Sequence, residues 1–157
     1  MQSGFVAGIM AALDFGQNRI KEAIRDLSPE QLAAVPDGFQ NSIATLVVHL
    51  AATEVNFAYR FRGEPVPDAL RAEFLLDKPH DPLPAPEGET AESLIAKLDK
   101  ARSVLTEAAE RLTDADLDRE WEGPGGRRMS VRLMLSILPY HQGLHFGHIQ
   151  YLKRMIG

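Results

Sequence analysis

The chain has 157 residues, of which 45% are hydrophobic and 25% charged, the balance of a folded globular domain. It contains no cysteine, which excludes disulfides, thiolate metal ligands and a cysteine nucleophile. Its formal net charge of −5 argues against a surface that tracks a phosphate backbone, so we expect no nucleic-acid partner.

The sequence also indicates the cellular compartment in which the protein works. No apolar run approaches the roughly 20 residues that a membrane-spanning helix needs, so we expect no membrane partner. The start of the chain, residues 1–4, lacks the positively charged region of a signal peptide. The absence of cysteine fits a reducing compartment. We therefore expect a cytoplasmic protein.

The first half of the chain predicts two long helices. Apolar residues recur at helical spacing over residues 3–26, and a short capped turn follows at Ser28 and Pro29. The second helix is expected to start at Asn41 or Ser42, which are good N-caps, and to end near Gly63, a good C-cap. His49 lies in this second helix.

A long connection follows at about residues 64–89, and it carries six of the ten prolines. A short helix is expected within it, around residues 68–76. Connections of this length are uncommon in compact domains and often cover a site or cross a bundle. His80 lies in this segment, and we expect it to be an exposed loop residue.

The second half of the chain predicts two more long helices, at about residues 90–112 and 130–156, with Thr90 and Ser130 at their starts. Gly123 and Pro124 begin a turn between them, and no convincing strand is expected anywhere. Four amphipathic helices predict an all-α fold, a four-helix bundle formed as one domain over residues 1–157.

The distance of each histidine from the start of its helix indicates whether the helices run parallel or antiparallel. His49 lies about 10 Å into the second helix, at about 1.5 Å per residue. That depth falls opposite Ile149 if the fourth helix is antiparallel to the second, and opposite Ile137 if it is parallel. His145 is nearer to Ile149 than to Ile137 along the helix, so the antiparallel arrangement brings it closer to the height of His49. This favours an up-down-down-up bundle, in which the long connection lets the second and third helices run parallel.

Three histidines, His141, His145 and His148, follow one another at steps of four and three residues in the last helix, which places them on one face. An i,i+4 pair of histidines can chelate one metal ion. Together with His49, the trio suggests a divalent metal site, although a structural or surface cluster is the alternative. A catalytic site needs three protein ligands and an open position.

We therefore take His49, His141 and His145 as the natural metal ligands. His148 is then a catalytic proton relay, a supporting residue or simply solvated. Thr53 and Asn56 share the side of His49 on its helix and are expected to support the ligands.

The sequence resembles the DinB family, also described as DinB/YfiT-like metal-dependent hydrolases. The resemblance covers essentially the whole chain. It rests on residues 27–32 (Leu-Ser-Pro-Glu-Gln-Leu), on residues 42–50 with their histidine, and on residues 140–152 with the His-x-x-x-His pair. Many relatives carry the sequence His-His-Arg-Gly-Gln near the end, whereas Leu144 precedes His145 here. The polar residues around His145 are therefore altered, and we expect the substrate contacts to differ.

The resemblance implies a four-helix bundle of unusual topology, often a homodimer. It implies a nickel or zinc ion held by His49, His141 and His145. It also implies a small-molecule substrate and, in some relatives, a transferase or isomerase reaction that uses a low-molecular-weight thiol. Others are called hydrolases.

Two functions remain open from the sequence. The first is a metal-dependent enzyme, a thiol-dependent transferase or a hydrolase, with the proline-rich connection as a lid over the pocket. The second is a non-catalytic metal-binding or stress-related bundle protein, since the sequence offers no confident acid, base or nucleophile besides the histidines.

Overall fold

Four long helices make up most of the fold, which is known from a computed structural model that describes residues 3–157. Met1 and Gln2, part of the segment compared above with a signal peptide, lie outside the described residues. The long helices are α1 (Gly4–Ile24), α3 (Ile43–Arg62), α5 (Ala91–Ala109) and α6 (Val131–Met155). Two short helices, α2 (Pro29–Ala33) and α4 (Asp68–Glu73), lie in the connections. The predicted all-α class is confirmed at this level.

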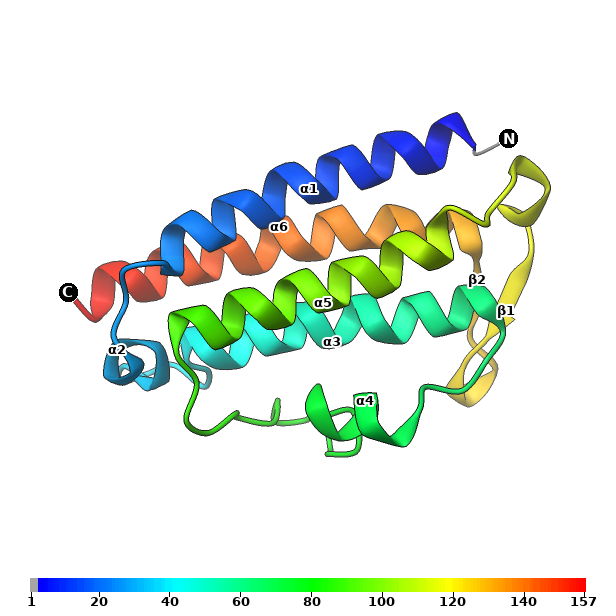
Figure 1. The fold of residues 1–157 in the computed structure, drawn as a ribbon. Helices are drawn as coiled ribbons and strands as arrows, with labels where there is room; N and C mark the ends of the chain where they lie inside the picture. The colour runs from blue at the N-terminus through cyan, green and yellow to red at the C-terminus, as the bar shows by residue number, and fades with distance from the viewer. Residues whose placement is uncertain (1–2) are drawn as a thin grey trace.

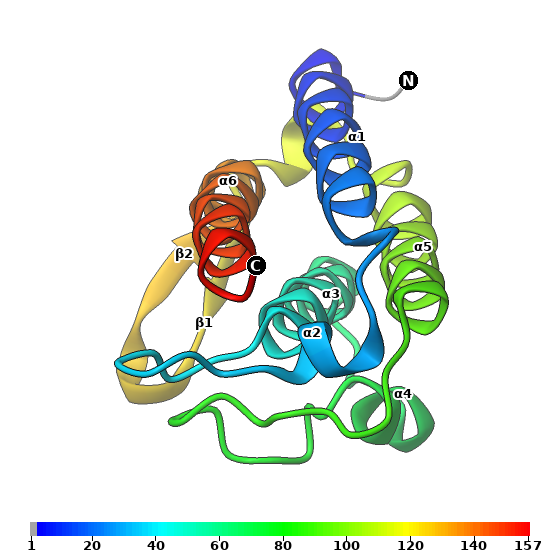
Figure 2. The ribbon, with the colours of Figure 1, turned by 90° about the vertical axis from the view of Figure 1, so that its left-hand side faces the viewer.

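The four long helices lie side by side (Figure 1). The helices α1 and α6 run in one direction, and α3 and α5 run in the other. Viewed from one end, they occupy four corners, with α3 opposite α1 (Figure 2). The helix α3 packs against both α5 and α6, and α1 packs against the same two helices. The connection between α3 and α5 returns along the length of α3 and carries α4.

The ends of the helices follow from their capping residues. The Ser42 hydroxyl accepts a hydrogen bond from the Thr45 amide at 3.1 Å, and Gly63 ends α3 in the left-handed conformation, with φ of 70°. The Ser130 hydroxyl accepts from the Leu133 amide at 3.1 Å at the start of α6. These caps fix which faces of α3 and α6 meet, and with them the positions of the histidines.

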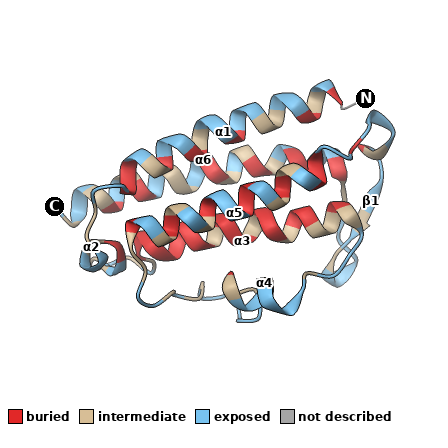
Figure 3. Cartoon of the chain, viewed as in Figure 1, coloured by how far each residue is buried: buried red, intermediate tan, exposed pale blue. Residues whose placement is uncertain are grey.

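The core is centred on α3, which is buried along most of its length (Figure 3). One apolar cluster joins the first half of α3 to α2, the start of α5 and the end of α6. A second joins the end of α3 to α1, the end of α5 and the start of α6. On α6 the apolar positions Leu138 and Ile149 belong to different clusters, and the histidines lie between them.

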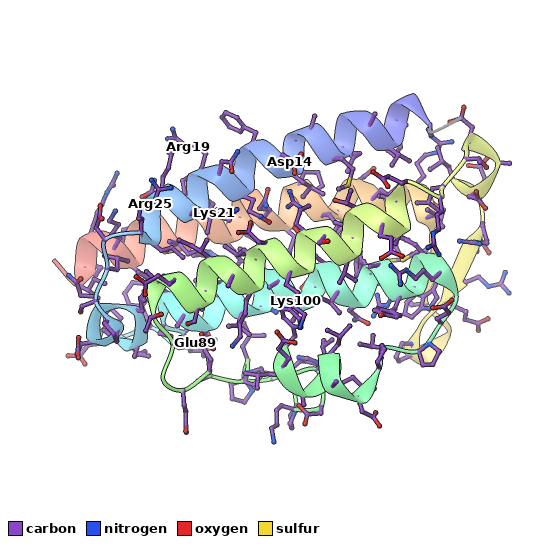
Figure 4. All side chains as sticks on the ribbon, in the orientation of Figure 1. Asp14, Arg19, Lys21, Arg25, Glu89 and Lys100 are labelled. Atoms are coloured by element: carbon purple, nitrogen blue, oxygen red, sulfur yellow. The ribbon has the colours of Figure 1, made fainter. Side chains whose placement is uncertain are left out.

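An ion-pair network crosses the interior between α1, α3 and α5. Arg102 of α5 donates two hydrogen bonds to the Glu54 carboxylate, at 3.1 and 2.6 Å, and a third to Asp14 at 2.5 Å. Asp14 lies on α1, as does Lys21, which bonds Asp99 of α5 (Figure 4). Because Glu54 and Arg102 are both buried, each is stable there only while the other is present.

The segment before α6 differs from the sequence prediction. It contains two 3₁₀ turns, η1 (Asp114–Asp116) and η2 (Pro124–Gly126), and two three-residue strands, β1 (Glu120–Glu122) and β2 (Arg128–Ser130). The strands pair antiparallel, with Trp121 opposite Met129. They are too short and too polar for alternating hydrophobicity to reveal them. The Arg60 guanidinium lies 3.9 Å from the centre of the Trp121 ring, which ties this hairpin to α3.

Within residues 3–157, every helix is too short or too polar to cross a bilayer.

Candidate metal centre

Three histidines from two helices converge where α3 and α6 pack together. The Nε2 atoms of His49 and His141 are 2.9 Å apart. One nitrogen from each of His49, His141 and His145 can be chosen so that all three lie within 4.8 Å of one another. The three ring centres are 4.6 to 5.1 Å apart, and the rings meet edge to face. The structure thus brings together the three residues that the sequence singles out as ligands.

The donor set fits a divalent ion of the zinc and nickel kind. Imidazole nitrogens bind such ions at about 2.0–2.1 Å, so two nitrogens that share an ion lie no more than about 4.2 Å apart. The His49 and His141 nitrogens already meet this limit. The 4.8 Å span of the whole group exceeds it, so at least one imidazole has to turn toward the others when all three bind one ion. These three residues could therefore hold a metal ion.

The electrostatics of the cluster favour neutral imidazoles, the form that binds metals. Burial lowers the pKa of His141 to about 3, with further lowering by His49 and His145. Burial also lowers the pKa of His145 to about 4, and His49 and His148 add to the effect. The pKa of His49 is lowered too, by burial first and by His80 second. At neutral pH all three rings are uncharged, and their nitrogens need no proton removed before binding.

The fourth histidine of interest, His148, lies outside this group and is exposed. Its Nδ1 atom is 3.3 Å from Nδ1 of His145, and the two ring centres are 5.4 Å apart. This contact engages one nitrogen of His145 and leaves Nε2 for an ion. His148 is thus placed between the cluster and solvent.

The surroundings of His49 differ from the sequence prediction in two respects. The Thr53 hydroxyl donates to the backbone carbonyl of His49 at 2.9 Å and does not bond its ring, and no bond from Asn56 to that ring is found within residues 3–157. His80 is exposed as expected, but it shares a small cavity with His49, Phe74 and Pro84. The proline-rich connection therefore covers His49 from one side, in keeping with the expectation that this long segment covers the site.

Comparison with known proteins identifies the family. The family model of the DinB superfamily matches residues 12–149, which include all of the histidines discussed here. The chain belongs to the DinB superfamily. The resemblance seen in the motifs is thereby confirmed.

A solved structure agrees with the DinB fold. A conserved protein from Enterococcus faecalis, known from a crystal structure, superposes with a TM-score of 0.75 at 14% sequence identity. The match covers 99% of this DinB-superfamily chain and 98% of the other. No curated protein matches the sequence. At this identity the likeness concerns the fold, and the chemistry has to be argued from the residues.

Proposed function

We propose that this protein is a metal-dependent enzyme that uses His49, His141 and His145 to hold one divalent ion, nickel or zinc. The observation that carries the proposal is the three-histidine group itself, with its lowered pKa values and its partial exposure to solvent. Within residues 3–157 this group contains no fourth ligand. A structural site is closed by four protein ligands, whereas a catalytic one keeps a position open.

The fold part of the proposal is an up-down-down-up four-helix bundle. It is supported by the directions of the four long helices and by the long connection beside α3 (Figures 1 and 2). In this order α3 and α6 are antiparallel neighbours, and the middle of one faces the middle of the other. The site then draws its residues from two rigid helices, which hold a catalytic geometry better than loops do.

The reaction we propose is a transfer or hydrolysis on a small molecule. When bound, the divalent ion supplies Lewis acidity, which favours the deprotonated form of a water molecule or thiol beside it. His148 lies 3.3 Å from His145 at the exposed edge of the cluster, where it can accept a proton and pass it to solvent. Since the chain contains no cysteine, a thiol nucleophile has to come from a low-molecular-weight cosubstrate.

The deciding experiment is metal analysis of the purified, tag-free protein beside the His141→Ala/His145→Ala variant. We expect close to one metal per chain in the wild type and a loss of at least tenfold in the folded variant, because an isolated His49 cannot chelate. His80→Ala is the matched control and should keep the metal. If wild type and double variant hold equal metal after nickel and zinc are supplied, the proposal is wrong. Circular dichroism shows whether the variant is folded.

If the metal is present, assays with and without low-molecular-weight thiols separate transfer from hydrolysis. A reaction that requires the thiol supports the transferase, and one that proceeds in its absence supports the hydrolase. We also propose that the protein forms a homodimer, as the family resemblance implies, and that it is cytoplasmic, as its composition suggests. Light scattering coupled to size exclusion measures the oligomeric state.

A further inference from the structure

A groove runs beside the histidine cluster along the same pair of helices. It has a volume of about 330 Å³ and lies between the end of α6 and the segment that precedes α3. Figure 2 shows this segment, which joins α2 to α3, passing beneath the end of α6. The lining comes from residues 38–41, from Leu46 on α3, and from His148, Tyr151 and Leu152 on α6. A groove of this size is at the lower end of small-molecule pockets, large enough for one ring and a short chain.

The groove lies next to the proposed metal centre, and His148 stands between the two. Leu46 precedes His49 by three residues on α3, so the two side chains share one side of that helix. His148 lines the groove, and its Nδ1 atom is 3.3 Å from Nδ1 of His145. A molecule in the groove therefore has its end one imidazole away from the cluster.

The lining is mostly apolar, with Gln40, Asn41 and His148 as its polar members. Leu46 and Leu152 are each 3% exposed, and they form the floor. The rings of Phe39 and Tyr151 have centres 5.8 Å apart and form an aromatic wall. Tyr151 remains 55% exposed, which leaves aromatic surface free for a ligand. The lining includes no aspartate, glutamate, lysine or arginine, so it offers no ion-pair partner from these four residue types.

A turn holds the aromatic wall in place. The Phe39 amide donates to the Pro36 carbonyl at 3.0 Å, and Gly38 takes a φ of 84° between them. A positive φ at the third position of a turn favours glycine. The turn brings Phe39 over α6 to meet Tyr151. Residues far apart in the sequence thus build the wall, and this placement is fixed by the backbone.

We propose that this groove binds the uncharged aromatic or similarly flat apolar part of the substrate, with the reacting polar group held at the histidine cluster. This inference rests on the proposed function, because it deepens the role of the same site. Phe39 and Tyr151 are its specificity-determining residues. An aromatic group that stacks on them gains affinity beyond what the burial of its apolar area supplies.

The test uses two chelators that differ only in the apolar part, acetohydroxamic acid and benzohydroxamic acid, titrated into the zinc-loaded protein by calorimetry. We expect the aromatic chelator to bind at least about tenfold more tightly, from ring stacking and burial together. The Phe39→Ser/Tyr151→Ser variant should lose this preference and bind acetohydroxamic acid as the wild type does. Phe15→Ser, which removes an exposed aromatic ring on α1, is the matched control and should keep the preference.

Two results would overturn the inference. One is equal affinity of the wild type for both chelators, and the other is an unchanged preference in the double variant. If the protein holds no zinc, the proposed function fails instead, and the groove is then tested alone by saturation-transfer NMR with benzyl alcohol. A signal that the double variant abolishes supports the groove, and a signal that it leaves unchanged contradicts it.

Discussion

At the scale of single residues, the cluster depends on imidazoles that stay neutral because they are half-buried and close together. A lone histidine on an apolar helix face is ordinarily satisfied by a hydrogen bond to a nearby group. Here the Nε2 atoms of His49 and His141 are instead 2.9 Å apart, within hydrogen-bond distance of each other. Burial is the main reason that their pKa values fall, and for His141 and His145 repulsion between neighbouring protonated imidazoles adds to it.

The first prediction at this scale concerns His148. His148→Ala should keep close to the wild-type metal stoichiometry, because its nearest contact is His145 and it is not part of the three-histidine group. The rate of the metal-loaded enzyme should fall about 10²-fold or more if His148 relays a proton. Added imidazole should restore part of the rate. Loss of the metal itself would show that His148 is a ligand, contrary to our assignment.

The second prediction is a pH dependence of the metal-free protein. In the unfolded chain a histidine titrates near pH 6.5, whereas His141 and His145 titrate at about 3 and about 4 in the folded state. Below pH 6.5 the unfolded chain therefore binds more protons, and the free energy of unfolding falls as the pH falls toward 4. The slope is at most about 1.4 kcal/mol per pH unit for each histidine, reduced by their partial exposure.

Urea denaturation in the presence of a chelator, at pH 7 and at pH 5, measures this slope. The His141→Gln/His145→Gln variant is the control and should show a flatter dependence, since glutamine does not titrate. Equal slopes for the two proteins would mean that other groups govern the acid sensitivity.

At the scale of helices, the ion-pair network decides how α1, α3 and α5 fit together. Burial raises the pKa of Glu54, against the opposing effect of Arg102. Burial alone would lower the pKa of Arg102, but Glu54 and Asp14 outweigh it, so the guanidinium stays charged. The network is therefore held by mutual dependence: removing one partner leaves the other charge buried and unpaired.

A double-variant experiment follows from this. Arg102→Ala should lower the free energy of unfolding by about 3–5 kcal/mol, because Glu54 is then stranded in the interior. Replacing both partners, as Glu54→Leu/Arg102→Met, should restore most of that loss. Chemical denaturation of the three proteins measures both effects. If Arg102→Ala costs less than about 1 kcal/mol, the pair is effectively solvated and the network has no structural role.

The helices also show what the sequence could predict and where it failed. The start and end of α3 were predictable, because Ser42 and Gly63 carry capping signals that depend on neighbouring residues alone. The convergence of His49 with His141 was predictable because helical spacing fixes faces. The hairpin before α6 was not, since its strands are three residues long. The Phe39 and Tyr151 wall was not either, because it depends on how a loop and a helix end meet.

At the scale of the whole molecule, the proposed ion would connect α3 to α6 across the bundle. A ligand that binds only the folded state stabilises it by about 2.7 kcal/mol when present at 100 times its Kd. For a domain of this size that corresponds to a rise in Tm of about 5–10 °C. We expect such a rise when zinc or nickel is added to the chelator-treated protein, measured by calorimetry.

The His49→Ala variant should show a much smaller rise, because it loses the only proposed ligand on α3. An equal rise in the two proteins would indicate that the metal binds elsewhere. Magnesium, which prefers oxygen ligands, is the matched control ion and should have little effect on either protein.

The separation of the cluster residues along the chain determines when a metal ion can bind during synthesis. His49 and His141 are 92 positions apart. At roughly 5–20 residues per second, a ribosome adds that length in about 5–18 s. During this interval His141 and His145 have not been added to the chain, so His49 has no partner in chelation. Metal loading therefore follows the synthesis of α6, and the ion cannot guide the earlier steps of folding.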